Sequence, residues 1–204
     1  MIFTFHTSRF TPVLKEGELA VTLAETFDLC QEIELRHAKL YATLSVRLGD
    51  VDERIARFWQ EMSAEEWQHH LLVGFGRSLC AQTFGLDGPA PRFADVSIER
   101  INETLSEYEE RVRAKQVTLN DAFEIAIALE TGESDAIYAE LVSTIKDAIY
   151  QSNRPYLLDR ISQMEQDMHD HVNHLIDAAK RFSINPDLVR KAHRLTDPQI
   201  PPLN

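Results

Sequence analysis

The chain is poor in cysteine and contains no cysteine motif. Its two cysteines, Cys30 and Cys80, stand alone, without a Cys-x-x-Cys pair. This excludes a zinc ribbon, a rubredoxin-type iron site and a dithiol redox motif within the chain, because each needs paired thiolates. We expect both cysteines to be reduced thiols packed in the core.

Long apolar runs and an excess of basic residues are also missing. Charged residues interrupt each apolar run before the length of about 18 residues that a membrane-spanning helix needs, and the first residues, MIFTFH, show no basic region, apolar region or cleavage site. Asp and Glu outnumber Lys and Arg by 33 to 21, which gives a net charge of -12. Phosphate binding needs clustered Lys and Arg, so neither nucleic acid nor an anionic membrane is expected as the main partner. We expect a soluble, cytoplasmic protein.

Helical periodicity is the main pattern that is present. Apolar residues recur at spacings of three and four along most of the chain, which predicts amphipathic helices. A length of 204 residues with 44% hydrophobic content is enough for one sizeable core in one domain. The predicted helices cover residues 18–48, 51–84, 97–115, 120–150 and 153–182, a short helix begins at Pro186, and Asn120 is the expected N-cap of the fourth. We expect residues 1–17 to be an irregular extension, 18–182 the helical domain, and 183–204 a short helix with a Pro-rich tail.

The connections between these helices predict the topology. Gly49-Asp50 is a short turn, so the first two long helices should form an antiparallel hairpin. The breaker-rich segment from Gly85 to Pro91 and the charged helix after it form a long crossover to a second hairpin. Two hairpins joined by one long crossover are typical of a ferritin-like antiparallel four-helix bundle. The predicted fold is therefore all-α, with an extra helix in the crossover and a short C-terminal helix.

Each long helix of this predicted bundle carries glutamate on its apolar stripe. The candidates are Glu34 with His37, Glu66 with His69, Glu130 with Glu133, and Glu165 with His169. Burying an unpaired carboxylate costs several kcal/mol, so its repetition on four helices favours a cation where the helices converge. Residues three or four apart share a helix face and can present two side chains to one point. A buried polar network without metal is the alternative.

The residue types indicate which metal this set would take. A carboxylate-rich set with imidazoles and no thiolate suits iron or manganese better than zinc or copper sites built on cysteine. Several glutamates can bridge two ions, and such a pair can deliver two electrons to a small oxidant. We therefore expect two iron ions as cofactor, with manganese or zinc as substitutes, and dioxygen or hydrogen peroxide as substrate.

These motifs resemble those of the rubrerythrin-like branch of the ferritin-like di-iron proteins, over roughly residues 18–182. Glu34 followed by Tyr41 resembles the first-helix ligand and its aromatic neighbour. Glu66-Trp67-Gln68-His69 resembles the second-helix Glu-x-x-His, and Glu130-Thr131-Gly132-Glu133 the third-helix Glu-x-x-Glu. The resemblance implies that Glu66 and Glu165 bridge two irons, that Glu34 binds one of them with Glu133 or His69, and that Glu130 binds the other with a histidine of the fourth helix.

The chain departs from this family pattern on the fourth helix. The family has Glu-x-x-His there, whereas Met168 stands three residues after Glu165 and His169 stands four after it. We expect His169 to complete the site, through a bulge or a different rotamer. Two further histidines are extra ligands or partners of a carboxylate: His37, and His70, which lies four residues after Glu66. His171 and His174 are expected to point away into solvent, and Tyr41 to pack near the metals.

The second departure is the missing rubredoxin domain of rubrerythrins proper. A peroxidase would then need a separate electron donor, such as a rubredoxin-like protein or a flavoprotein reductase, and we expect a homodimer. The resemblance implies an oxidoreductase that reacts with hydrogen peroxide or dioxygen in oxidative-stress defence. The alternatives are a ferroxidase or iron-storage protein and a metal-free helical interaction module.

Overall fold

The computed structural model describes residues 21–88, 98–114, 117–130 and 133–196, and leaves out the side chains of residues 133–136, 160, 163–165, 167–169 and 196. The described residues form helices and no strand, which confirms the all-α prediction. The α-helices are α1 (Leu23–Leu48), α2 (Glu53–Thr83), α3 (Ile98–Arg113), α4 (Leu119–Glu130), α5 (Glu133–Gln151), α6 (Leu158–Phe182) and α7 (Pro186–His193). Two short 3-10 helices cover Pro155–Leu157 and Arg194–Thr196.

Side-chain caps define where several helices begin. α1 starts with a capping box, in which the Glu25 amide donates to the Thr22 hydroxyl and the Thr22 amide donates to the Glu25 carboxylate. α4 has the same arrangement, because Thr118 and Asp121 exchange equivalent hydrogen bonds. The expectation that Asn120 caps this helix is therefore wrong. The Asn120 side chain instead accepts a hydrogen bond of 3.3 Å from the hydroxyl of Ser183, which follows the last residue of α6.

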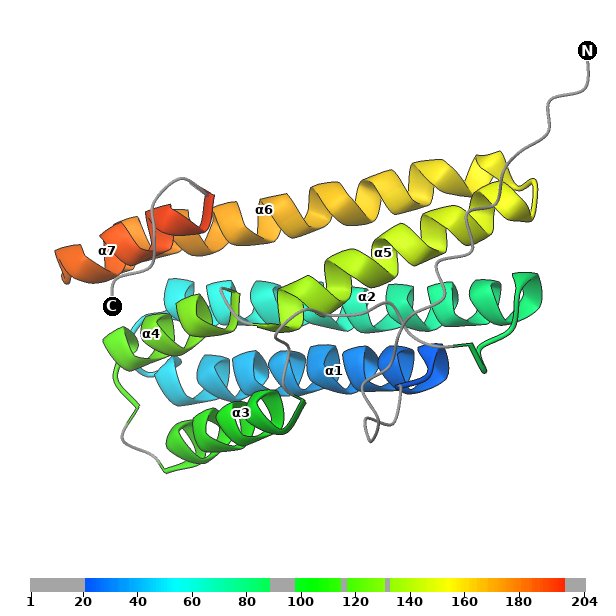
Figure 1. Cartoon of the computed structure of the whole chain (residues 1–204). Helices are drawn as coiled ribbons and strands as arrows, with labels where there is room; N and C mark the ends of the chain where they lie inside the picture. The colour runs from blue at the N-terminus through cyan, green and yellow to red at the C-terminus, as the bar shows by residue number, and fades with distance from the viewer. Residues whose placement is uncertain (1–20, 89–97, 115–116, 131–132, 197–204) are drawn as a thin grey trace, which may run out of the picture.

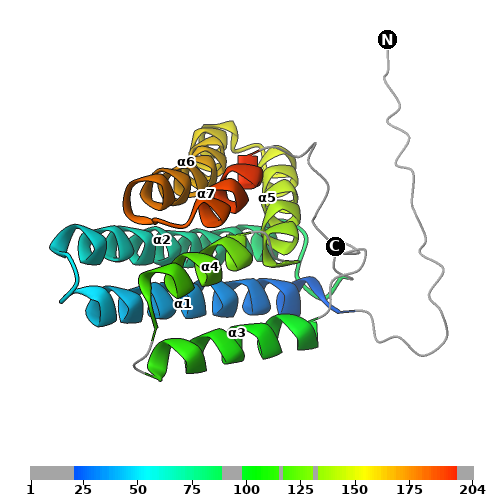
Figure 2. The ribbon, with the colours of Figure 1, turned by 90° about the vertical axis from the view of Figure 1, so that its left-hand side faces the viewer.

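The hairpin of α1 and α2 is the centre of the molecule. The two helices run antiparallel along their whole lengths (Figure 1), and the Val51 amide closes the turn between them on the Leu48 carbonyl at 3.0 Å. α3 packs on α1 at one side of the hairpin, whereas α5 and α6 pack on α2 at the other (Figures 1 and 2). Helices from distant parts of the sequence therefore meet around the middle of α2.

The sequence predicts one helix over residues 120–150, and the structure differs in this range. The structure has two helices there, α4 and α5, on either side of residues 131–132, which lie outside the described part of the chain. After α5 the chain turns at Asn153, whose φ of 54° is in the left-handed region that asparagine tolerates better than most residues. Pro155 then opens the 3-10 helix that leads into α6.

The core is continuous through the helices. Cys30 and Cys80 are both buried within it and form no disulfide among the described residues, as expected, and burial raises the pKa of the Cys80 thiol to about 12. Fully buried aromatic residues, among them Tyr41, Trp59 and Phe123, fill the space between α1, α2 and α4. Within the described residues, each helix is too short or too polar to span a lipid bilayer.

Candidate metal centre

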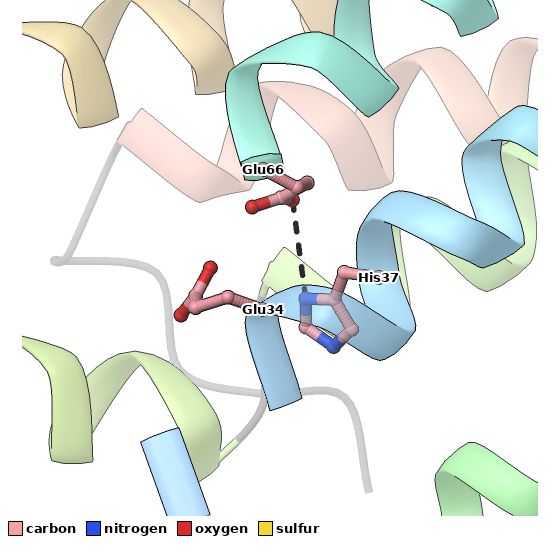
Figure 3. A group of neighbouring side chains, drawn as sticks. All are labelled: Glu34, His37 and Glu66. Carbon is pink, nitrogen blue, oxygen red and sulfur yellow. Dashed lines mark ion pairs between the residues drawn. The ribbon is translucent and has the colours of Figure 1, made fainter. Parts of the chain in front are cut away.

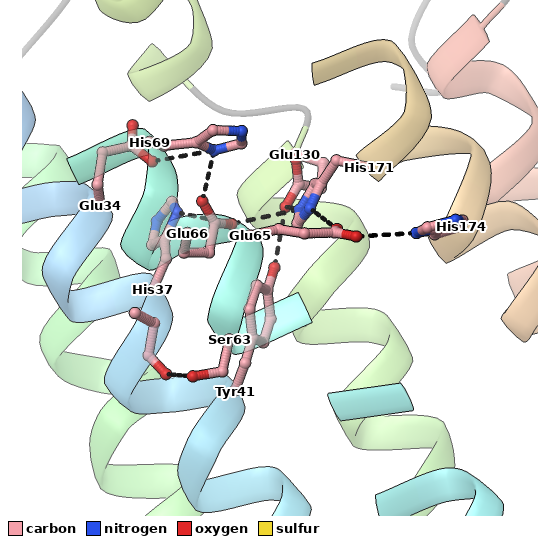
Figure 4. A network of polar contacts seen from close by, with 11 residues as sticks. Glu34, His37, Tyr41, Ser63, Glu65, Glu66, His69, Glu130, His171 and His174 are labelled. Carbon is pink, nitrogen blue, oxygen red and sulfur yellow. Dashed lines mark hydrogen bonds and ion pairs between the residues drawn. The ribbon is translucent and has the colours of Figure 1, made fainter. Parts of the chain in front are cut away.

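Acidic and imidazole side chains from four helices meet inside the core (Figure 4). They surround a cavity of about 40 Å³, large enough for about three water-sized spheres. The cluster consists of Glu34 and His37 from α1, Glu66 and His69 from α2, Glu130 from the end of α4, and His171 from α6. We call these six residues the buried cluster.

The carboxylates of the buried cluster are almost entirely removed from solvent. Glu66 is 2% exposed and Glu34 is 6% exposed, although ionised side chains of this kind are rarely buried without a partner. Glu66 lies in the middle of α2, between Met62 and Val73 of the core. An apolar helix face therefore carries a carboxylate toward the cavity, as the sequence predicts.

The first group of potential ligands consists of Glu34, His37 and Glu66. One donor atom from each lies within 4.8 Å of the others, so that all three can contact one ion. Within this group, His37 Nδ1 lies 3.9 Å from Glu66 Oε1 (Figure 3). His37 stands three positions after Glu34, and both side chains therefore leave the same face of α1.

The second group consists of Glu66, Glu130 and His171. Their donor atoms also lie within 4.8 Å of one another, and His171 Nε2 is 2.9 Å from Glu130 Oε1 and 3.3 Å from Glu66 Oε1. Glu66 belongs to both groups. The geometry thus offers two adjacent three-ligand sites that share one carboxylate.

His69 also lines the cavity and contacts both Glu34 and Glu66. Its Nδ1 is 3.0 Å from Glu66 Oε2 and 3.6 Å from Glu34 Oε2. It therefore holds both carboxylates in place through one nitrogen. The Tyr138 ring lies beside the His69 ring, with centroids 5.4 Å apart.

Burial and mutual contact shift the protonation of the buried cluster. Burial, followed by the charge of Glu66, raises the pKa of Glu34 to about 8, against the opposing effect of His69. Burial acts to lower the pKa of His69, but the hydrogen bonds to Glu34 and Glu66 outweigh it and raise that pKa to about 10. Burial also acts to lower the pKa of His171. The nearby carboxylates of Glu130 and Glu66 outweigh this effect and raise that pKa well above its usual value. Protons thus balance the carboxylate charge in the metal-free state.

Residues around the buried cluster hold its members in position. The Tyr41 hydroxyl donates to Glu130 Oε1 at 2.9 Å, which confirms the expectation that Tyr41 lies near this site. Glu65 contacts His171 Nδ1 at 2.7 Å through one oxygen and His174 Nδ1 at 3.0 Å through the other. A row of hydrogen bonds therefore runs from the exposed His174 to the buried cluster (Figure 4).

The expectation that His171 points into solvent is wrong. His171 is 2% exposed and supplies the imidazole that α6 brings to the site. The sequence contained a signal for it, because His171 precedes the buried Leu175 by four residues and therefore shares its helix face. His174 is exposed as expected, although it contacts Glu65.

Other predicted residues lie elsewhere or outside the described part. The His70 Nδ1 contacts the Gln31 carbonyl at 2.8 Å, and His70 is not a member of either three-ligand group. The side chains of Glu133, Glu165 and His169 lie outside the described residues. Their predicted ligand roles therefore stay predictions.

The donors present fit a pair of divalent cations. His37 presents Nδ1 toward Glu66 at 3.9 Å, and its Nε2 is buried with no hydrogen-bond partner among the described residues, so these residues do not fill the hydrogen-bonding capacity of the ring. The buried cluster supplies carboxylate and imidazole donors and no thiolate, a combination that suits iron and manganese. Comparison with protein-family models, curated proteins and solved structures gives no match for this chain.

Proposed function

We propose that the chain is a ferritin-like di-metal oxidoreductase whose buried cluster binds two iron ions and reacts with hydrogen peroxide or dioxygen. The observation that supports it most is the pair of three-ligand groups that share Glu66. A shared carboxylate is what a pair of ions about 3.5 to 4 Å apart needs as a bridge. In this proposal α1, α2, α4 with α5, and α6 form the four-helix bundle, and α3 belongs to its crossover.

The ligands divide between two ions. Glu34 and His37 would hold one ion and Glu130 and His171 the other, and Glu66 belongs to both ligand groups. His69, in contact with two of these carboxylates, is a further ligand or the partner that orients them. A pair of ferrous ions held by these residues would supply two electrons to a small oxidant.

The chain's own residues prepare this reaction. The hydrogen bond from His171 Nδ1 to Glu65 fixes the ring so that Nε2 faces the cavity. Tyr41 donates a hydrogen bond to Glu130 and thereby restricts its rotamers. The cavity of about 40 Å³ is too small for a bulky reductant to enter. Electrons for repeated turnover therefore need a separate donor at the surface, and a rubredoxin-like protein or a flavoprotein reductase fits this role.

One observation favours the metal-free alternative. Protonated His69 and His171 already contact the carboxylates of the buried cluster, so that the cluster can be stable as a polar network without an ion. A helical interaction module would need nothing more. Ferrous loading separates the two proposals, because the interaction module has no use for iron.

The proposed reaction is tested on anaerobic protein loaded with ferrous iron. We expect it to consume about one hydrogen peroxide per two ferrous ions in a single fast phase. Glu66→Ala should abolish this phase, and Glu61→Ala, which removes an exposed glutamate from the same helix, should keep it. Loaded protein that leaves peroxide and dioxygen unchanged would overturn the oxidoreductase proposal. A large hollow assembly in size-exclusion chromatography would instead favour iron storage.

A further inference from the structure

A second site lies on the surface, between the first turns of α2 and the last turns of α6. It is a groove of about 500 Å³, within the range of about 300–1,000 Å³ that is typical of small-ligand pockets. Its lining residues are Arg54, Arg57, Phe58 and Glu61 from α2, and His174, Asp177, Ala178, Arg181 and Phe182 from α6. We call it the arginine groove.

The charge of the arginine groove is opposite to that of the whole chain. Three arginines and two carboxylates line it, whereas the chain has a net charge of -12. One of those carboxylates, Asp177, is already paired with Lys180 at 3.1 Å. What the groove offers an anion is therefore its guanidinium groups, within a chain whose overall charge is negative.

Two of the three guanidinium groups are available to a ligand. Asp52 holds Arg54 through several contacts, the shortest being 2.6 Å. Among the described residues Arg57 pairs with Glu53 alone, at 3.4 Å and with both side chains more than two-thirds exposed, an arrangement that contributes little. The Arg181 guanidinium lies 5.2 Å from the centre of the Phe182 ring and makes no ion pair with a described side chain.

The floor of the groove is apolar. Phe58 is 8% exposed and Ala178 is 6% exposed, and the half-buried Phe182 continues this surface beneath Arg181. An apolar floor with guanidinium groups at its rim matches a ligand with a flat apolar body and an anionic end. An inorganic anion alone would leave the floor in contact with water.

We propose that the arginine groove binds an organic anion in which a carboxylate, sulfonate or phosphate is attached to an aromatic body. Arg57 and Arg181 bind the anionic group, and Phe58 and Phe182 pack against the body. His174 lines the groove and also contacts Glu65, which reaches His171. The occupant therefore lies at the outer end of the hydrogen-bonded row to the buried cluster, although its binding does not depend on a metal there.

The test uses metal-free protein and 1-anilinonaphthalene-8-sulfonate, a fluorescent aromatic sulfonate. We expect saturable binding at one site per chain. The double variant Arg57→Gln, Arg181→Gln should lower the affinity about tenfold or more, because it removes both charge-assisted contacts. Both arginines are exposed, so circular dichroism should show an unchanged fold.

Arg113→Gln is the matched control. Arg113 is 69% exposed and pairs with Glu109 four residues before it, at 3.7 Å, much as Arg57 pairs with Glu53. The control should change the affinity less than about twofold. The uncharged analogue N-phenyl-1-naphthylamine should bind at least about tenfold more weakly than the sulfonate. The proposal would be overturned if the double variant bound the sulfonate as tightly as the unchanged protein does. It would also be overturned if Arg113→Gln lost as much affinity as the double variant, or if the uncharged analogue bound as tightly as the sulfonate.

Discussion

Metal loading should release protons, because the buried cluster holds protons where the ions would bind. The pKa of Glu34 is about 8, so about nine-tenths of this carboxyl is protonated at pH 7. His171, with a pKa well above its usual value, is also protonated there. Both are proposed ligands and must lose their protons to bind a cation. We therefore expect release of about two protons per chain at pH 7, and about three if His69 also becomes a ligand.

The number of protons should depend on pH in a defined direction. Between pH 7 and pH 9 the protonated fraction of Glu34 falls from about 0.9 to about 0.1, because its pKa of about 8 lies between them. Release should therefore decrease by nearly one proton over this range, whereas the contribution of His69, with a pKa of about 10, should change little. The remaining release comes from the histidines.

Calorimetry of Mn²⁺ binding measures this release. Titrations in two buffers with different ionisation enthalpies give the proton number from the difference in observed heat, and manganese avoids a redox reaction. Glu66→Ala serves as the control, since it should show neither binding nor proton release. Tight binding without proton release, or a release that stays constant from pH 7 to pH 9, would refute this account of the buried cluster.

Two further predictions concern stability. In the folded protein the pKa of Glu34 is about 8 and that of His69 is about 10, both above the ordinary values. The melting temperature of metal-free protein should therefore fall as pH rises from 7 to 10, more steeply than that of metal-loaded protein. Parallel pH profiles of the two forms would count against this prediction. A Cβ on Gly76 would overlap the buried Ile145 side chain, whereas a Cβ on Gly74 would meet only the end of the flexible Gln31 side chain. In urea unfolding, Gly76→Ala should therefore cost about 1–3 kcal/mol and Gly74→Ala should be neutral or stabilise by up to about 1 kcal/mol, and equal effects of the two substitutions would contradict the packing described here.

Periodicity was sufficient to predict the helices and most of their faces. The spacing of apolar residues predicted α1, α2, α3 and α6, and the break at Gly49-Asp50 predicted the hairpin of α1 and α2. It did not predict that α4 and α5 are two helices, although residues 130–135 contain no apolar residue and the apolar spacing is therefore interrupted between Leu129 and Ala136. Thr118 was not predicted as the N-cap of α4, although Thr118 and Asp121 have the spacing of a capping box.

The buried cluster was predictable only in part. Glu34, Glu66, His69 and Glu130 follow from carboxylates and imidazoles on apolar stripes, and the structure brings them together. His171 was missed because a resemblance to a Glu-x-x-His motif directed attention to His169. The contact of Glu65 with His171 joins α2 to α6, and the relative register of two helices distant in sequence cannot be read from the periodicity of either one.

The number of ions bound per chain tests the central claim most directly. Equilibrium dialysis against ferrous iron without oxygen, followed by metal analysis, should give two ions per chain, and Glu66→Ala should lose both because the two ligand groups share this carboxylate. Glu61→Ala should still bind two. Absence of bound iron in the unchanged protein, or one ion retained at full affinity in Glu66→Ala, would contradict a di-metal site bridged by Glu66.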